Sequence, residues 1–416
     1  MPTSAGPNIA GESNIVFAYD TGDTSNSYRG QPTTNTMRQS NNVTGTQYGY
    51  NNEYDTCQLV KTWNASLKTP VGTGATLLTE QNSGNSPWYS LNWYDESEDG
   101  KRCLSAYIYP VNSVTQLRFG MVGDSGNSVF FNLVTRAITY GAGISNTNAF
   151  IQDVPGYPGW LRVGANIEGR SGGWVAFLGT GFESYYTPST PYQSFYVCGI
   201  QYERNIATHC TQFTPAETTR SSTQSLLPLI NNPTINLSSV SYDSGAQIVF
   251  DGTDDTISID SYSAIQLVDN VSIEYVYMRL STDPVLDIIA NKYHTVGWEL
   301  FCQTGATFAL AGRNGDGTYY ATSNAAYTIQ NNQYYHVVAI KDGLSWRLYV
   351  NGALYASLTA NTVGTWSNTG VLQIGGEGNG YYPNMKLPIF KIYNTVLSAD
   401  QIKQNYNKYK TRFNLS

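Results

Sequence analysis

The sequence is poor in charged residues and in histidine, and it has no long apolar run. Only 13% of its 416 residues are Asp, Glu, Lys or Arg, about half the roughly 25% of an average soluble domain. The net charge of −7 and the lack of a Lys/Arg block exclude the basic face that nucleic-acid binding requires. No stretch approaches the roughly 18 apolar residues of a membrane span. We therefore expect neither nucleic-acid binding nor membrane insertion.

The cysteines do not suggest a disulfide framework, because their number is odd and no C-x-x-C pair occurs. They are Cys57, Cys103, Cys198, Cys210 and Cys302. This pattern indicates reduced, mostly buried thiols, and Cys198 alternates with Tyr196 and Ile200 in a strand-like run that we assign to the core. The N-terminus lacks the basic and apolar regions of a signal peptide. We expect synthesis in a cytoplasm.

The residue patterns that catalysis would need are also missing. Three histidines, at positions 209, 294 and 336, are too scattered to indicate a zinc site or a catalytic triad, and for His336 we predict a packing role. The acidic run at residues 95–100 and the acids Asp251, Asp254 and Asp255 fall in predicted turns, with a calcium loop as the alternative. We predict no enzyme activity, no catalytic residue, no metal and no cofactor.

What the sequence does have is alternation with a period of two. Tyrosine is abundant, at 33 residues against 14 Phe and 8 Trp, and its ring suits a half-buried sheet surface. Strand-like runs such as residues 104–109, 116–122 and 346–350 are separated by Gly, Asn, Asp and Pro turns at intervals of about ten residues, which is typical of sandwiches and jelly rolls.

Helical periodicity appears only near the C-terminus. Ser398 and Gln401 have the spacing of a capping box, and Ile402, Tyr406 and Tyr409 fall on one helical face. We predict an all-β chain of two antiparallel β-sandwich (jelly-roll) domains, with an N-terminal arm and a short C-terminal helix.

Composition divides the chain into four parts. Residues 1–40 are rich in Gly, Ser, Asn and Thr and contain one apolar run at 15–19, which predicts an arm with a short strand; a disordered tail is the alternative. We expect the first sandwich over residues 41–213 and the second, with the terminal helix, over 242–416. Alternation is lost between them, so residues 214–241 are predicted to form a linker.

Five ordered motifs in the second half resemble laminin G-like, concanavalin A-like jelly rolls. They are the hairpin opening IVFDGTDDTISI at 248–259, the strand VSIEYVYM at 271–278, YHVVAIKDG at 335–343, WRLYVNGA at 346–353 and LQIGG at 372–376. The resemblance covers about residues 242–410 and implies a jelly roll in which Ile257 and Ile259 face inward. Asn351 and Gly352 would form a type I′ turn.

The first half carries a second resemblance. WLRV at 160–163 and FYVCGIQYE at 195–203, with Gly199, Gln201 and Glu203 in a G-x-Q-x-E pattern, are similar to carbohydrate-binding-module-like domains of phage structural proteins. NIVFAYDTG at 14–22 resembles the start of tailed-phage proteins. Together these resemblances imply a virion structural protein on the particle exterior, as a capsid decoration or head fibre.

The expected partners follow from that reading. We expect contacts with other virion structural proteins, homo-oligomerisation, a virion-surface location and weak multivalent binding of host-surface or environmental glycans. Candidate carbohydrate-binding residues are loop aromatics near amides, namely Trp88, Tyr89, Tyr381 and Tyr382; packing against another subunit or domain is the alternative role. The alternative functions are a tail-fibre receptor-binding subunit and a secreted bacterial lectin or adhesin.

Overall fold

The structure is a computed structural model that describes most of the chain. It describes residues 12–416 apart from residues 25, 36, 38–40, 45–58, 81–89, 96–100, 113–115, 122–123, 142–147, 169–173, 180–192, 205–209, 217, 244–246, 282–285, 294–295, 304–306, 314–316, 325–327, 362–364 and 377–379. No helix in the described part of the chain is long and apolar enough to cross a membrane.

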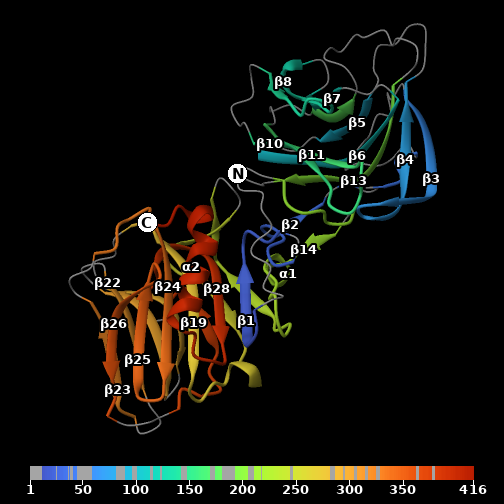
Figure 1. The fold of residues 1–416 in the computed structure, drawn as a ribbon. Helices are drawn as coiled ribbons and strands as arrows, with labels where there is room; N and C mark the ends of the chain where they lie inside the picture. The colour runs from blue at the N-terminus through green and yellow to red at the C-terminus, as the bar shows by residue number, and fades with distance from the viewer. Residues whose placement is uncertain are drawn as a thin grey trace. The chain divides into compact units, whose positions relative to one another are not determined.

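The chain forms two compact units (Figure 1). The terminal unit consists of Met1–Gln31, Ser221–Asp243 and Gln247–Ser416, and the inserted unit consists of Pro32–Arg220. The second unit therefore lies, in sequence, between two parts of the first. Both are built from antiparallel sheets, which confirms the predicted all-β class.

The terminal unit contains two large sheets. The eight-stranded sheet has the order β16 (Ser241–Tyr242), β17 (Ile248–Asp251), β28 (Asn384–Tyr393), β19 (Val271–Arg279), β24 (Tyr334–Asp342), β25 (Ser345–Val350) and β26 (Ala353–Thr359), with β1 (Ile15–Asp20) also paired to β28. The seven-stranded sheet has the order β15 (Ile235–Ser238), β18 (Thr256–Ile259), β27 (Leu372–Ile374), β20 (Leu286–Tyr293), β21 (Gly297–Gln303), β22 (Thr307–Arg313) and β23 (Tyr319–Ser323).

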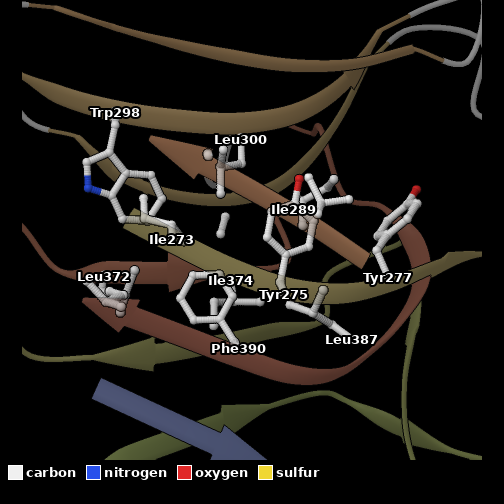
Figure 2. Packing of buried hydrophobic residues seen from close by; sticks show 14 of the residues in the cluster. Ile273, Tyr275, Tyr277, Ile289, Trp298, Leu300, Leu372, Ile374, Leu387 and Phe390 are labelled. Carbon is white, nitrogen blue, oxygen red and sulfur yellow. The ribbon is translucent and has the colours of Figure 1, made fainter. Parts of the chain in front are cut away.

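The main core of this unit lies between the two sheets. Figure 2 shows Ile273 and Tyr275 of β19 and Phe390 of β28 among side chains from the facing sheet, such as Trp298 and Leu300 of β21. All five are at most 4% exposed. Ile257 and Ile259 are also buried in this core, as predicted from the hairpin motif.

The other face of the eight-stranded sheet is covered by helix α2 (Ala399–Phe413). Ser398 caps the helix and forms the predicted capping box with Gln401. Ile402, Tyr406 and Tyr409 are buried, which confirms the predicted apolar face. Because both faces of the sheet are covered, its central strands are buried almost without alternation.

Two short segments of the terminal unit lie where the sequence had predicted an arm and a linker. Strand β1 forms at the apolar run of the predicted arm. It pairs with β28, and the paired residues of the two strands lie more than 350 positions apart in the sequence. Helix α1 (Ser222–Ser225) and strand β15 form within residues 214–241, and β15 pairs with β18. Outside these two segments, a 3-10 turn, η2, spans Ser263–Ile265.

The inserted unit also contains two large antiparallel sheets. The six-stranded sheet has the order β10 (Ala149–Asp153), β11 (Leu161–Glu168), β6 (Lys101–Asn112), β13 (Ser194–Arg204), β4 (Gly72–Thr79) and β3 (Val60–Thr69). The five-stranded sheet has the order β5 (Ser90–Asp95), β12 (Trp174–Gly179), β7 (Gln116–Met121), β8 (Asp124–Asn132) and β9 (Ile138–Tyr140), and a separate pair joins β2 (Thr33–Thr34) to β14 (Thr219–Arg220).

The G-x-Q-x-E pattern on β13 fixes the segment that follows this strand. Glu203 accepts hydrogen bonds from the backbone N–H and the hydroxyl of Thr211, and Gln201 accepts one from the backbone N–H of Thr214. Arg220 donates to the hydroxyls of both threonines. Burial raises the pKa of Glu203. These hydrogen bonds hold Thr211 and Thr214 against the outer face of the sheet.

Cys198 is fully buried, as predicted, but in a satellite cluster. It packs with Ala75 and Trp160 instead of joining the main core of the inserted unit. Cys57 lies outside the described residues, and the other four cysteines are free thiols.

Candidate functional site

The candidate site in the terminal unit is built around the loop that joins β27 to β28. The loop begins at Gly375 and Gly376, whose backbone N–H groups donate to the carbonyls of Ile289 and Ile288 at 3.0 and 2.9 Å. On the other side, the Ile288 N–H donates to the carbonyl of Tyr381 at 3.2 Å. The β20 strand therefore holds both ends of the loop in place.

Tyr382 lies directly against the backbone of Gly376. A Cβ atom added to Gly376 would come within 2.5 Å of the Tyr382 ring, and Gly376 has a φ of +109°. Only glycine permits both the close approach and this backbone conformation. The Tyr382 ring is half-buried, so its position is fixed while part of it stays accessible.

Tyr381 has a different environment from its neighbour. Its half-buried side chain packs against a small cluster formed by Ile288, Phe301, Ala309 and Ala311, separate from the main core. Of the two tyrosines predicted from the sequence, Tyr381 therefore packs on the sheet, whereas Tyr382 lies against the loop glycine.

An acidic turn lies beside Tyr382. A Cβ atom added to Gly252 would lie 3.7 Å from the Tyr382 carbonyl oxygen and 3.3 Å from the Asn384 Cβ. The preceding residue, Asp251, pairs with Asn384 across β17 and β28. From the sequence, the acids of this turn are predicted to be turn residues, with a calcium loop as the alternative. The pairing of β17 with β28 brings them next to the predicted tyrosine.

The three carboxylates of the turn lie close to one another. Ligand atoms of Asp251, Asp254 and Asp255 are all within 4.8 Å, an arrangement that could hold one hard cation. Asp255 is 1% exposed and accepts a hydrogen bond of 2.6 Å from the Asp251 N–H. Burial, with added repulsion from Asp251 and Asp254, raises the Asp255 pKa to about 6. No described cation forms an ion pair with these acids.

The other two predicted site residues, Trp88 and Tyr89, lie outside the described residues. Their role in binding therefore stays a prediction. The acidic run at 95–100 is described only at Asp95, the last residue of β5. His209 and His294 also lie outside the described residues.

The comparison with protein families concerns the part of the chain that carries this site. Residues 251–403 match the family described as "Concanavalin A-like lectin/glucanases superfamily". The terminal unit contains a laminin G-like, concanavalin A-like lectin domain. Strands β1 and β15–β17 begin outside the matched residues.

Two toxin binding domains illustrate the comparison with solved structures. The binding domain of Paraclostridial Mosquitocidal Protein 1 has a TM-score of 0.40 and 16% identity, over 44% of this chain and 49% of that one. The botulinum neurotoxin serotype D binding domain has a TM-score of 0.38 and 16% identity, over 45% and 49%. The chain spans about half the length of these structures. A search of curated proteins found no match.

Proposed function

We propose that this protein is a non-enzymatic, glycan-binding structural protein on the outside of a bacteriophage particle, as a capsid decoration or head fibre. The observation that carries the binding part of the proposal is the rim site of the lectin-like domain. We define the rim site as Tyr381, Tyr382, Asn384 and the acidic turn Asp251–Asp255. It combines a fixed aromatic ring with carboxylates and an amide on neighbouring strands.

The chemistry of the rim site suits a sugar. The flat C–H face of a pyranose packs on an aromatic ring such as that of Tyr382. Its hydroxyl groups donate to carboxylates, and Asp251 and Asp254 are exposed in the turn whose Gly252 approaches the Tyr382 backbone carbonyl. Because the loop glycines fix Tyr382 before a ligand arrives, binding costs little ordering of the site.

The particle-level part of the proposal is supported by sequence resemblance. The motifs at residues 14–22 and 195–203 resemble those of tailed-phage structural proteins, and the low charge suits a particle surface rich in neutral polar groups. Many copies on one particle would raise the avidity of a weak single site without any additional contact.

Cryo-electron microscopy of purified virions tests the location. Density for this chain on the outside of the capsid supports the proposal, whereas density at the tail tip favours a receptor-binding subunit. If the chain is absent from the particle, the virion role is wrong.

A Tyr382→Ala variant tests the rim site. We expect weaker retention of the variant on immobilised host-surface glycans, while a Tyr319→Ala variant, which removes an exposed tyrosine of β23 instead, keeps wild-type retention. Equal retention of all three proteins would remove the rim site from the proposal.

A further inference from the structure

A row of four side chains crosses the six-stranded sheet of the inserted unit. Thr62 of β3 lies opposite Leu77 of β4, and Leu77 lies opposite Tyr196 of β13. Tyr196 in turn lies opposite Tyr109 of β6. Directly opposed residues share a face of the sheet, so these four side chains form a continuous row across four strands.

The row lies on the outer face of the sheet. The neighbours of Leu77 and Tyr196 along their strands, Leu78 and Phe195, point into the main core, and successive strand residues point to opposite faces. Thr62 is exposed, Leu77 and Tyr196 are half-buried, and Tyr109 is 37% exposed.

Neighbouring residues hold the two tyrosines of the row in place. The Tyr109 ring lies 5.6 Å from the Trp160 ring, and a Cβ added to Gly159 would come within 2.7 Å of it. The Tyr196 hydroxyl accepts a hydrogen bond of 3.5 Å from the Asn64 amide. Rings fixed before binding lose little conformational entropy when a ligand covers them.

The row itself carries no charge. Of its described neighbours on the same face, Val60 (45% exposed), Asn64, Thr79 and Ser194 are also uncharged. A charged neighbour, Arg162 of β11, lies opposite Tyr107, with its guanidinium over the Tyr107 and Phe150 rings, and donates to the Thr211 carbonyl. The row therefore offers no charge of its own to a phosphate, a sulfate or a carboxylate, and it complements a neutral ligand.

The dimensions of the row distinguish a small ligand from a protein partner. Neighbouring strands are about 4.8 Å apart, so three spacings give a row of about 14 Å, the length of a few hexose rings. A whole aromatic side chain offers ~150–250 Å²; because Tyr109 is 37% exposed and Tyr196 is half-buried, the two rings together expose on the order of 150 Å². That is below the ~800 Å² per partner of a stable protein interface.

We propose that this row, the sheet-face platform, binds a neutral oligosaccharide whose ring faces pack on Tyr109 and Tyr196. The ligand class rests on the proposed function, but the residues and the unit differ from those of the rim site. Each chain then has two separate saccharide sites, and a particle carrying many chains has twice the number of contacts available for avidity.

Affinity electrophoresis of the full chain tests the platform, with hydroxyethyl cellulose, dextran or yeast mannan as neutral polymers in the gel. Thr62→Arg places a long cationic side chain on the exposed end of the row without removing a packed group. Val134→Arg is the matched control, since Val134 is 70% exposed in a turn of the same unit. Val60→Arg, on the same face as Thr62, is used if Thr62→Arg does not fold.

We expect at least one polymer to retard wild type and Val134→Arg equally, and to bind Thr62→Arg about tenfold more weakly. No retardation of wild type by any polymer, or equal retardation of all variants, overturns the platform. Loss in Tyr382→Ala but not in Thr62→Arg overturns it while leaving the rim site standing. The reverse pattern supports the platform and removes the rim site. Self-association of wild type that Thr62→Arg abolishes makes the face a contact between copies and overturns the saccharide assignment.

Discussion

The Nε2 atom of His336 lies 2.7 Å from Oε1 of Glu274, and both side chains are completely buried. They project from β24 and β19 on the face of the sheet that α2 covers. The pair belongs to a larger network, since the Tyr393 hydroxyl donates to the other Glu274 oxygen at 2.5 Å and the Asn405 amide of α2 donates to it at 3.2 Å.

A buried cation completes this network. Lys391 is 2% exposed and lies 3.6 Å from Glu274 and 2.8 Å from Glu12, and its ammonium group lies 5.4 Å from the centre of the Tyr409 ring. Burial alone would raise the Glu274 pKa, but Lys391 and the hydrogen bonds from His336 and Tyr393 outweigh it and lower the pKa to about 2. The network joins the sheet, the helix and the segment before β1.

Replacing Glu274 by Gln should destabilise the terminal unit strongly. The variant leaves Lys391 buried with only Glu12 to neutralise it, and breaking a buried pair by removing one partner costs about 3–5 kcal/mol. Urea unfolding at pH 7 measures the loss. Asp400→Asn, an exposed change in the first turn of α2, is the control and should cost less than about 1 kcal/mol. Similar losses in both variants would contradict this role of the network.

The same carboxylate predicts an acid-sensitive stability. A pKa depressed from 4.5 to about 2 in the folded state stabilises the protein above pH 4.5, and this contribution is lost as the pH falls from 4.5 to 2. The free energy of unfolding of wild type should therefore approach that of Glu274→Gln over this range. A constant difference in the free energy of unfolding between the two proteins from pH 7 to pH 2 would rule out ionised Glu274 as the source of the extra stability.

Asp255 predicts the opposite behaviour at the rim site. Its folded pKa of about 6 exceeds the ordinary 3.8, so ionisation destabilises the folded state increasingly between pH 3.8 and 6. In chelator-treated buffer, Asp255→Asn should be more stable than wild type by on the order of 2 kcal/mol at pH 7.5. The Asp255→Asn variant keeps an acceptor for the Asp251 N–H, and its gain in the free energy of unfolding should vanish below about pH 4. A variant less stable than wild type at pH 7.5 would show that repulsion between the acids is not the dominant effect.

The terminal unit should fold without the inserted unit. Tyr28 bridges to Leu226, and the Arg29 N–H donates to the Ser225 carbonyl at 2.8 Å, so the ends of the excised segment are adjacent. Replacing residues 32–220 by a short Gly/Ser linker should preserve a cooperative unfolding transition. The near-UV circular dichroism of the Trp346–Trp366 pair, whose ring centres lie 4.9 Å apart, should persist. A chain without fixed near-UV signal would mean that the unit depends on the insertion.

Deleting residues 1–20 provides the contrasting variant. It removes β1, which is buried along its whole length, and exposes the edge of β28. It also removes Glu12 from the Lys391 network. We expect a lower thermal midpoint and aggregation through the exposed edge, measured by light scattering during heating. A midpoint equal to that of the full chain would show that β1 adds no stability.

The features that depend on local sequence could be predicted from the residues alone. The alternation of apolar residues predicted the all-β class, because side-chain direction in a strand repeats every two residues. The capping box at Ser398 and the apolar face of α2 were confirmed because their contacts lie within one or two helical turns. The ordered motifs of the second half placed the lectin-like domain for the same reason: each is a strand or turn read over a few residues.

Only the tertiary structure decided which distant strands lie together. The sequence predicted a strand near residues 15–19, but local periodicity carries no information on its pairing with β28. For the same reason, the sequence could not predict that the acidic turn lies beside Tyr382 or that a row runs from Thr62 to Tyr109. Each of these arrangements depends on the register of strands far apart in the chain. That register is set by which faces are buried and by long-range packing, and both exist only once the sheets have formed.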